Sequence, residues 1–242
     1  MSSHLTKIFG IDLGTTYSCI SYIDEHGKPV IVPNVDNQRI TPSVVFFDGD
    51  NIVVGEVAKE SARVYPNDVV DFVKRSMGDP NFRFQHHGKS YSPEEISSYI
   101  LRKLVQDAQQ NLREVITDVV ITCPAYFGIN EREATRRAGV IANLNVRQIL
   151  NEPTAAAIAY GTVESSEQKV VLVYDLGGGT FDVTMIAIAP DAIDVICTGG
   201  DHDLGGKNWD DSIINYLVAQ FQAQTGISED ILADADTCQA LQ

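Results

Sequence analysis

The feature that most constrains the fold of this chain is an internal repeat. The sequences IFGIDLGTTYSCISYI at residues 8–23 and VLVYDLGGGTFDVTMIAI at residues 171–188 follow the same pattern. In both, an apolar strand ends in Asp-Leu-Gly, turns through small or hydroxyl-bearing residues and continues as a second strand. Asp12 and Asp175 stand at equivalent points of the two copies. Two such hairpins predict two walls that face each other.

The segments around the repeat alternate between strand and helix patterns. Strands are expected at residues 42–47, 52–54, 118–123 and 146–150, and helices at residues 92–113, 130–143, 153–160 and 208–225. Ser92, Pro93 and Glu95 form a capping-box sequence at the start of one helix. Asn130 is expected to cap another. This alternation predicts an α/β fold.

The last of these helices has an apolar face and a glycine stop. The face, which we expect to point into a core, consists of Ile213, Ile214, Leu217, Val218 and Phe221. Gly226 is placed to end the helix.

Both turns of the repeat have a composition suited to phosphate. Glycines at 14, 177, 178 and 179 allow positive φ and a close approach of backbone N–H groups to phosphate oxygens, and Thr15, Thr16 and Thr180 add hydroxyl donors. Asp12 and Asp175 would repel a phosphate. They therefore predict a Mg²⁺ ion or its water shell between them.

Two common glycine-rich motifs match this sequence less well. A dinucleotide fingerprint needs GxGxxG opening a helix, whereas residues 181–189 read as a strand. A P-loop needs GxxxxGK[ST], and the Gly-Gly-Lys of residues 205–207 has neither the spacing nor a following Ser or Thr. Two hairpin turns without a ligand would account for the glycines, but not for the paired aspartates.

Charge and composition argue against several classes of binding partner. Eighteen basic against 33 acidic residues give a net charge of -15, which disfavours nucleic acid and anionic membranes. No signal peptide or membrane span is evident, so a cytoplasmic location is expected. The four cysteines show no CxxC spacing, so neither a zinc site nor a disulfide scaffold is indicated.

With these motifs in hand, the chain resembles the seventy-kilodalton heat-shock (DnaK-like) chaperones over nearly its whole length. IDLGTTYS at residues 11–18 is similar to the first phosphate loop of that family, and DLGGGTFDV at residues 175–183 to the second. Actins and sugar kinases of the same superfamily share these two loops. More specific are NEPTAAAIAYG at residues 151–161, ITPSVVFF at residues 40–47 and CPAYF at residues 123–127.

The resemblance implies an α/β actin-like (ribonuclease H-like) ATPase fold whose lobes close on ATP or ADP with Mg²⁺, K⁺ being a further candidate ion. It implies that Lys74 is the catalytic lysine, that Glu152 and Asp182 hold the water shell of the metal or orient the attacking water, and that Thr180 lies beside the γ-phosphate. The implied nucleotide-binding residues are Gly14, Thr15, Thr16, Tyr17, Gly177, Gly178, Gly179 and Thr180, with Asp12 and Asp175 holding Mg²⁺ through water. Pro124 and Arg132 match family positions that relay the nucleotide state, with a structural role as the alternative.

Two departures from the family pattern stand out. In GGKNWD at residues 205–210, Lys207 and Asn208 replace the usual Glu and Asp. The chain is also short for the complete domain: we expect residues 1–165 to form lobe I and residues 166–242 part of lobe II, without the adenosine-binding part and the peptide-binding domain. ATP affinity weaker than micromolar is therefore expected.

The function implied is that of the ATP-binding and ATP-hydrolysing domain of a chaperone that drives peptide binding and release in protein folding and the stress response. A J-domain co-chaperone, a nucleotide exchange factor and unfolded polypeptides are the implied partners of the full-length protein. The alternatives are an actin-like scaffold, a sugar-kinase-like enzyme of the superfamily, and a regulator that keeps the fold without turnover.

Overall fold

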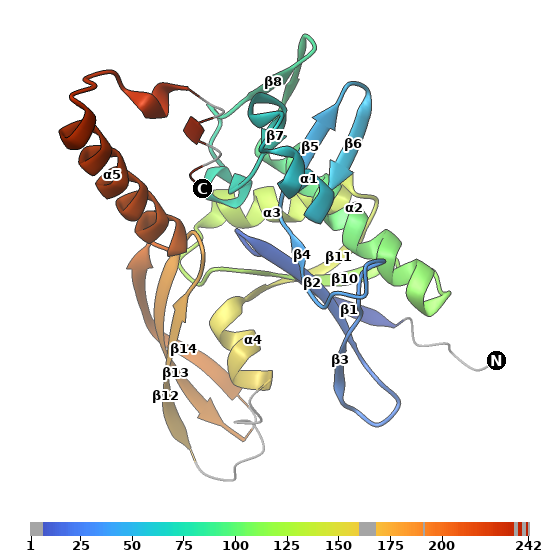
Figure 1. Cartoon of the computed structure of the whole chain (residues 1–242). Helices are drawn as coiled ribbons and strands as arrows, with labels where there is room; N and C mark the ends of the chain where they lie inside the picture. Colours follow the sequence, from blue (N-terminus) through green and yellow to red (C-terminus); the bar gives the residue numbers. More distant parts are fainter. Residues whose placement is uncertain (1–6, 160–167, 191, 235–236, 239–240, 242) are drawn as a thin grey trace.

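A computed structural model describes residues 7–159, 168–190, 192–234, 237–238 and 241 of the chain (Figure 1). The end of the helix expected at residues 153–160 and the expected lobe boundary between residues 165 and 166 lie outside these residues. The described part is a mixed α/β structure with several sheets, as the alternation of strand and helix patterns predicts.

The largest sheet has six strands and contains the first copy of the repeat. Its order is β11-β10-β1-β2-β3, and β4 pairs with the end of β2. The strands are β1 (Ile8–Asp12), β2 (Tyr17–Ile23), β3 (Pro29–Ile31), β4 (Thr41–Pro42), β10 (Asp118–Cys123) and β11 (Asn145–Asn151). Strands β1 and β2 pair antiparallel, as in the predicted hairpin, and β3 and β4 pair antiparallel with β2, whereas β1, β10 and β11 run parallel. Because β1, β10 and β11 are parallel, the ends of all three meet at one edge of the sheet.

Two helices cover one face of this sheet. In α2 (Pro93–Leu112), the Ser92 hydroxyl accepts from the backbone N–H of Glu95 and the Glu95 carboxylate from that of Ser92, so the predicted capping box is confirmed. The expected Asn130 cap is wrong, since α3 (Ile129–Ile141) begins one residue earlier, after Gly128. The main core lies between these helices and the sheet and includes Phe9, Ile11, Ile96, Ile100, Leu101, Val119 and Ile121.

Small elements surround this core. The strands expected at residues 42–47 and 52–54 include β5 (Val45–Asp48) and β6 (Asn51–Val54), which pair as a hairpin. Strand β5 also pairs with β7 (Val69–Val70). The others are α1 (Glu56–Ser61), η1 (Pro66–Asp68), η2 (Val73–Ser76) and the pair β8 (Phe84–His86) and β9 (Lys89–Tyr91). Of these, η2 supplies side chains to the site.

The second copy of the repeat forms a separate three-stranded sheet. It contains β12 (Lys169–Leu176), β13 (Phe181–Ala189) and β14 (Ala192–Asp201), all antiparallel. The first two strands are the predicted hairpin; β14 was not expected. Helix α4 (Glu152–Ala159) lies between the two sheets (Figure 1), and its Ala157 packs in a small core with Ile186 and Ile188 of β13.

Helix α5 (Gly206–Thr225) follows the second sheet and extends away from it (Figure 1). Gly226 ends it with φ 74°, as predicted. The expected core face is wrong in part: Ile214 is buried, but Ile213, Leu217 and Phe221 are exposed, because the described elements cover only one flank of the helix. Within the described residues, no helix combines the length and apolar character needed to cross a bilayer.

Candidate nucleotide and metal site

One cavity of about 630 Å³ lies between the two copies of the repeat. Its walls include the predicted site residues Asp12, Gly14, Thr15, Thr16, Tyr17, Lys74, Glu152, Asp175, Gly177, Gly178, Thr180 and Asp182. Gly179 alone among the predicted site residues does not line it. Residues expected from sequence to act together are therefore adjacent, although β12 and β1 are far apart in the chain.

The first turn, residues 13–16, is held by hydroxyl groups. Ser43 Oγ donates to the Gly14 carbonyl oxygen at 2.8 Å and lies 2.8 Å from Ser18 Oγ. Ser18 Oγ also accepts from the Gly14 N–H at 3.1 Å. A Cβ atom at Gly14 would overlap the carbonyl oxygen of Tyr17, so glycine is required here by lack of space.

The second turn, residues 177–180, packs directly on the first. It is closed by a hydrogen bond from the Gly177 N–H to the Thr180 carbonyl at 3.0 Å. A Cβ at Gly178 would overlap the Thr16 side chain, and one at Gly179 the side chain of Thr15.

These glycines do not use the positive φ that their residue type allows. Neither Gly14 nor any glycine of the second turn is among the positive-φ residues of the described chain. Glycine is needed at 178 and 179 because the two turns touch there, and at 14 because the Tyr17 carbonyl oxygen of the same turn leaves no room, whereas a Cβ at Gly177 would make only an ordinary contact.

Lys74 enters the cavity from η2 and forms a buried ion pair. Its Nζ lies 2.6 Å from Glu152 Oε1, and the two side chains are 7% and 16% exposed. Burial favours the neutral lysine, yet the carboxylates of Glu152 and Asp12 outweigh it and raise the pKa of Lys74. Burial raises the pKa of Glu152 to about 7, although Lys74 opposes the shift. The site thus holds a fixed cation beside a carboxyl group able to exchange a proton near neutral pH.

Three aspartates share the same cavity. Asp12 accepts from Thr122 Oγ1 at 2.8 Å. Burial, and then the nearby Asp12 charge, raise the pKa of Asp175. Burial also raises the pKa of Asp182 to about 6, partly opposed by the Ala125 N–H that donates to its Oδ2 at 3.3 Å. The Asp12 charge therefore disfavours ionisation of Asp175, and the Asp175 charge disfavours ionisation of Asp182.

This donor set fits a hydrated cation. A divalent ion stabilises carboxylates that lie close together, and oxygen ligands are those that Mg²⁺ prefers. Asp182 Oδ1 and Thr16 Oγ1 are buried without a hydrogen-bond partner in the described part of the chain, so both can still bond a ligand or its water. Among the described residues no group of three or more His, Cys, Asp or Glu side chains could ligate a metal directly.

Sequence reasoning missed several residues that support the site. Thr122 orients Asp12, Ser43 holds the first turn, and Arg75 donates through Nε to the Gly179 carbonyl at 2.9 Å. Ser43 lies in a motif singled out from the sequence, and Arg75 adjoins Lys74. Their bonding partners are distant in the chain and left no local signal.

Arg132 supports the loop that contacts Asp182. Its guanidinium donates to the carbonyls of Phe127 and Ala125 at 2.8 and 3.1 Å, and to Asn151 Oδ1 at 2.7 Å. The loop that supplies the Ala125 N–H is therefore tied to the end of β11. These contacts are compatible with either role considered for Arg132.

The comparison with protein families agrees with this architecture. The family model for the Hsp70 protein matches residues 8–86 and 79–242. The chain therefore belongs to the Hsp70 family. Membership supports an actin-like ATPase fold and a chaperone ATPase-domain role, and proteins of this family generally bind ATP or ADP with Mg²⁺.

The acidic cavity should destabilise the ligand-free protein. We expect Asp182→Asn to raise the free energy of unfolding at pH 8 by about 1 kcal/mol, since a charged group in an unfavourable environment is removed. Because the pKa of Asp182 is raised from 3.8 to about 6 in the folded protein, its protonated form favours folding below pH 3.8, and this contribution is lost as pH rises through about 6. The gain should therefore disappear at pH 4, as measured by thermal unfolding. The exposed Asp50→Asn should change nothing at either pH; an Asp182→Asn variant less stable than the parent at pH 8 would contradict this account.

Proposed function

We propose that this chain binds ATP and ADP with Mg²⁺ in the cavity between its two turns, as part of the ATP-hydrolysing domain of a DnaK-like chaperone. In this proposal residues 1–165 belong to lobe I and residues 166–242 to lobe II. The observation that carries it is the meeting of two glycine turns, Asp12 and Asp175, and the buried Lys74–Glu152 pair in one cavity.

Each group has a role that its surroundings support. Backbone N–H groups of Thr15, Thr16 and Tyr17, and of residues 178–180, would bind phosphate oxygens. Gly14 and Gly177 would line the phosphate site as parts of the two turns, since their own N–H groups are bonded to Ser18 Oγ and to the Thr180 carbonyl. The Thr180 side chain would contact the γ-phosphate. The Lys74 ammonium would balance the negative charge that develops on the transferring phosphoryl group.

Two carboxyl groups would manage the attacking water. Glu152 has a pKa near neutrality and can take up a proton, while Asp182 Oδ1 has no donor in the described chain and can orient a water molecule. Asp12, aligned by Thr122, and Asp175 would hold Mg²⁺ through its water shell. Bound Mg²⁺ would supply charge neutralisation of the phosphates, with K⁺ as a further candidate ion.

The wider role follows from the family. We infer that this ATPase is coupled to peptide binding and release in protein folding and the stress response, in the cytoplasm. A J-domain co-chaperone, a nucleotide exchange factor and unfolded polypeptides are its proposed partners.

Calorimetry with ADP tests the proposed site. The chain should bind ADP with Mg²⁺ with an affinity weaker than micromolar, and removing Mg²⁺ with a chelator should raise the Kd about 10-fold. In the double variant Asp12→Asn, Asp175→Asn, the effect of Mg²⁺ should vanish, whereas Asp50→Asn should retain it. No heat of binding at millimolar ADP, or equal binding with and without Mg²⁺ in the unaltered chain, would refute the proposal.

A further inference from the structure

Arg75 connects the two parts of the chain that form the cavity. It follows Lys74 in η2, and the two side chains point to different partners: Lys74 to Glu152, Arg75 to the second turn. The Arg75 Nε–H donates to the Gly179 carbonyl at 2.9 Å, and its Nη2 donates to Asn208 Oδ1 at 3.0 Å. A single guanidinium therefore holds both the second turn and the first turn of α5.

Asn208 belongs to the first turn of α5, which is bonded to the second turn of the repeat. Its Oδ1 also accepts from the Gly205 N–H at 2.9 Å. At the start of α5, Gly206 N donates to the Gly177 carbonyl at 3.0 Å and Lys207 N to the Gly178 carbonyl at 2.9 Å. A shift of Asn208 would therefore move the carbonyls of the second turn with it.

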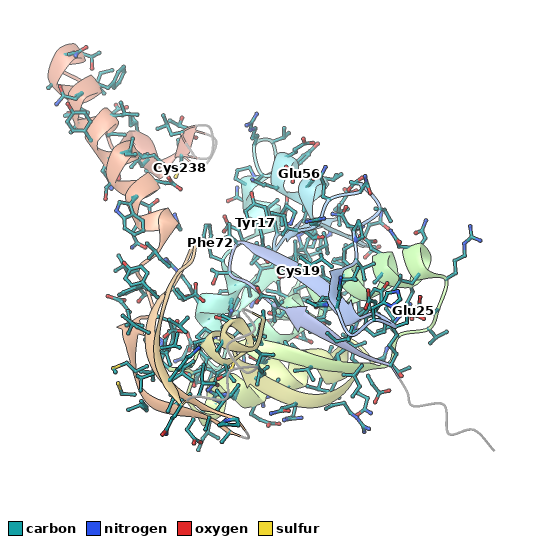
Figure 2. The ribbon with its side chains drawn as sticks, turned by 90° about the horizontal axis from the view of Figure 1, so that it is seen from below. Tyr17, Cys19, Glu25, Glu56, Phe72 and Cys238 are labelled. Carbon is teal, nitrogen blue, oxygen red and sulfur yellow. The ribbon has the colours of Figure 1, made fainter. Side chains whose placement is uncertain are left out.

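A cation–π contact from each side reinforces this junction. The ring of Phe72 lies 5.8 Å from Arg75 Cζ and 5.4 Å from Lys207 Nζ. Figure 2 shows Phe72 where the start of α5 approaches the first turn and Tyr17. Phe72 has φ 50°, a left-handed conformation that bulky residues adopt only where the surrounding structure enforces it.

We propose that Arg75 is a positioning residue for the nucleotide: with Asn208 as its partner, it holds the second turn against the first and so controls how fast bound nucleotide leaves. The inference rests on the proposed nucleotide site. Because Asn208 is neutral, the contact is a charge-assisted hydrogen bond and not an ion pair. A carboxylate at this position would strengthen it and slow release.

The test measures release of a fluorescent ADP analogue from the full chain with Mg²⁺, chased with unlabelled ADP. Arg75→Ala should speed release about 10-fold, and Asn208→Asp should slow it several-fold. Arg75→Lys should restore part of the lost retention. The double variant Arg75→Ala, Asn208→Asp should behave like Arg75→Ala, since the added carboxylate has lost its partner. Arg63→Ala, an exposed arginine away from the cavity, should match the parent.

The double variant separates positioning from general damage to the fold. If Arg75→Ala acted only by destabilising the fold, Asn208→Asp would still slow nucleotide release in the protein that lacks the Arg75 side chain. That outcome would overturn the inference. Parent-like release in Arg75→Ala would overturn it as well. If the unaltered chain fails to bind Mg²⁺-ADP in calorimetry, the proposed nucleotide site falls and this inference with it.

Discussion

Replacing Lys74 by alanine is expected to lower the free energy of unfolding by about 3 kcal/mol at pH 8, because it leaves the buried Glu152 carboxylate without its partner. The loss should be smaller by about 1 kcal/mol at pH 5.5. Burial holds the pKa of Glu152 at about 7 even with Lys74 present, so below that value the carboxyl group is largely neutral in both proteins. As pH rises above 7, Glu152 ionises more readily in the unaltered protein than in the Lys74→Ala variant, and the difference in stability between the two grows. Thermal or urea unfolding at the two pH values measures this.

The chain offers a matched control for this prediction. Lys7 and Glu114 form an ion pair of similar length, 2.7 Å, but both side chains are 38% exposed. Lys7→Ala should therefore change stability by less than about 0.5 kcal/mol at either pH. Adding Glu152→Gln to Lys74→Ala should recover part of the loss. An equal loss at pH 5.5 and pH 8 would show that the ionisation of Glu152 does not cause the loss of stability.

The same substitution should also remove catalysis if the proposed function holds. Single-turnover ATP hydrolysis should fall by a factor of about 100 or more, since a preorganised positive charge at the phosphoryl group is lost. ADP binding should remain largely intact. Unchanged single-turnover hydrolysis in Lys74→Ala would rule out the role assigned to this lysine.

Gly14→Ala is expected to destabilise the fold much more than Gly177→Ala, although the two glycines occupy equivalent positions of the repeat. A Cβ at Gly14 would overlap the backbone oxygen of Tyr17, which cannot move without disturbing β2. At Gly177 the nearest atom to a Cβ is the Thr180 carbonyl oxygen at 3.4 Å, an ordinary contact. We expect Gly14→Ala to destabilise the fold by about 2–3 kcal/mol and Gly177→Ala by less than about 0.5 kcal/mol.

Thermal unfolding of the two variants side by side checks this pair. Neither glycine has a positive φ, so the difference reports on space and not on backbone conformation. Gly199→Ala, where a Cβ meets nothing within 4 Å, gives the baseline for an added methyl group. Equal destabilisation by Gly14→Ala and Gly177→Ala would mean that the first turn can relax around the new atom.

The repeat shows which parts of the fold can be predicted from local sequence patterns. The two hairpins, the stretch of β13 and the capping box of α2 follow from period-two alternation and from residues a few positions apart, which act through the backbone near them. The same reasoning failed at β14, whose exposed strand lacks a clear alternation. It also failed for α5, where the pattern correctly predicted a helix but not how little of its apolar face is covered.

Some residues of the candidate site were predicted from the sequence, and others were found only in the structure. Motifs placed Asp12, Asp175 and the glycine turns in one functional group, and the structure brings them to one cavity. The sequence showed no sign that Thr122 bonds Asp12 or that Arg75 crosses to Asn208, because each partner lies more than a hundred residues away. Their roles with nucleotide and metal stay predictions.

The sequence by itself determined the paired hairpins, the helices that follow them and the residue types that suit phosphate and magnesium, since these depend on local periodicity and on side-chain chemistry. Only the tertiary structure decided that the two turns touch, that Lys74 is buried against Glu152 and that the glycines serve to save space. These properties arise from packing and from electrostatics in a shielded cavity, which act between segments distant in the chain and are not encoded in any short stretch of it.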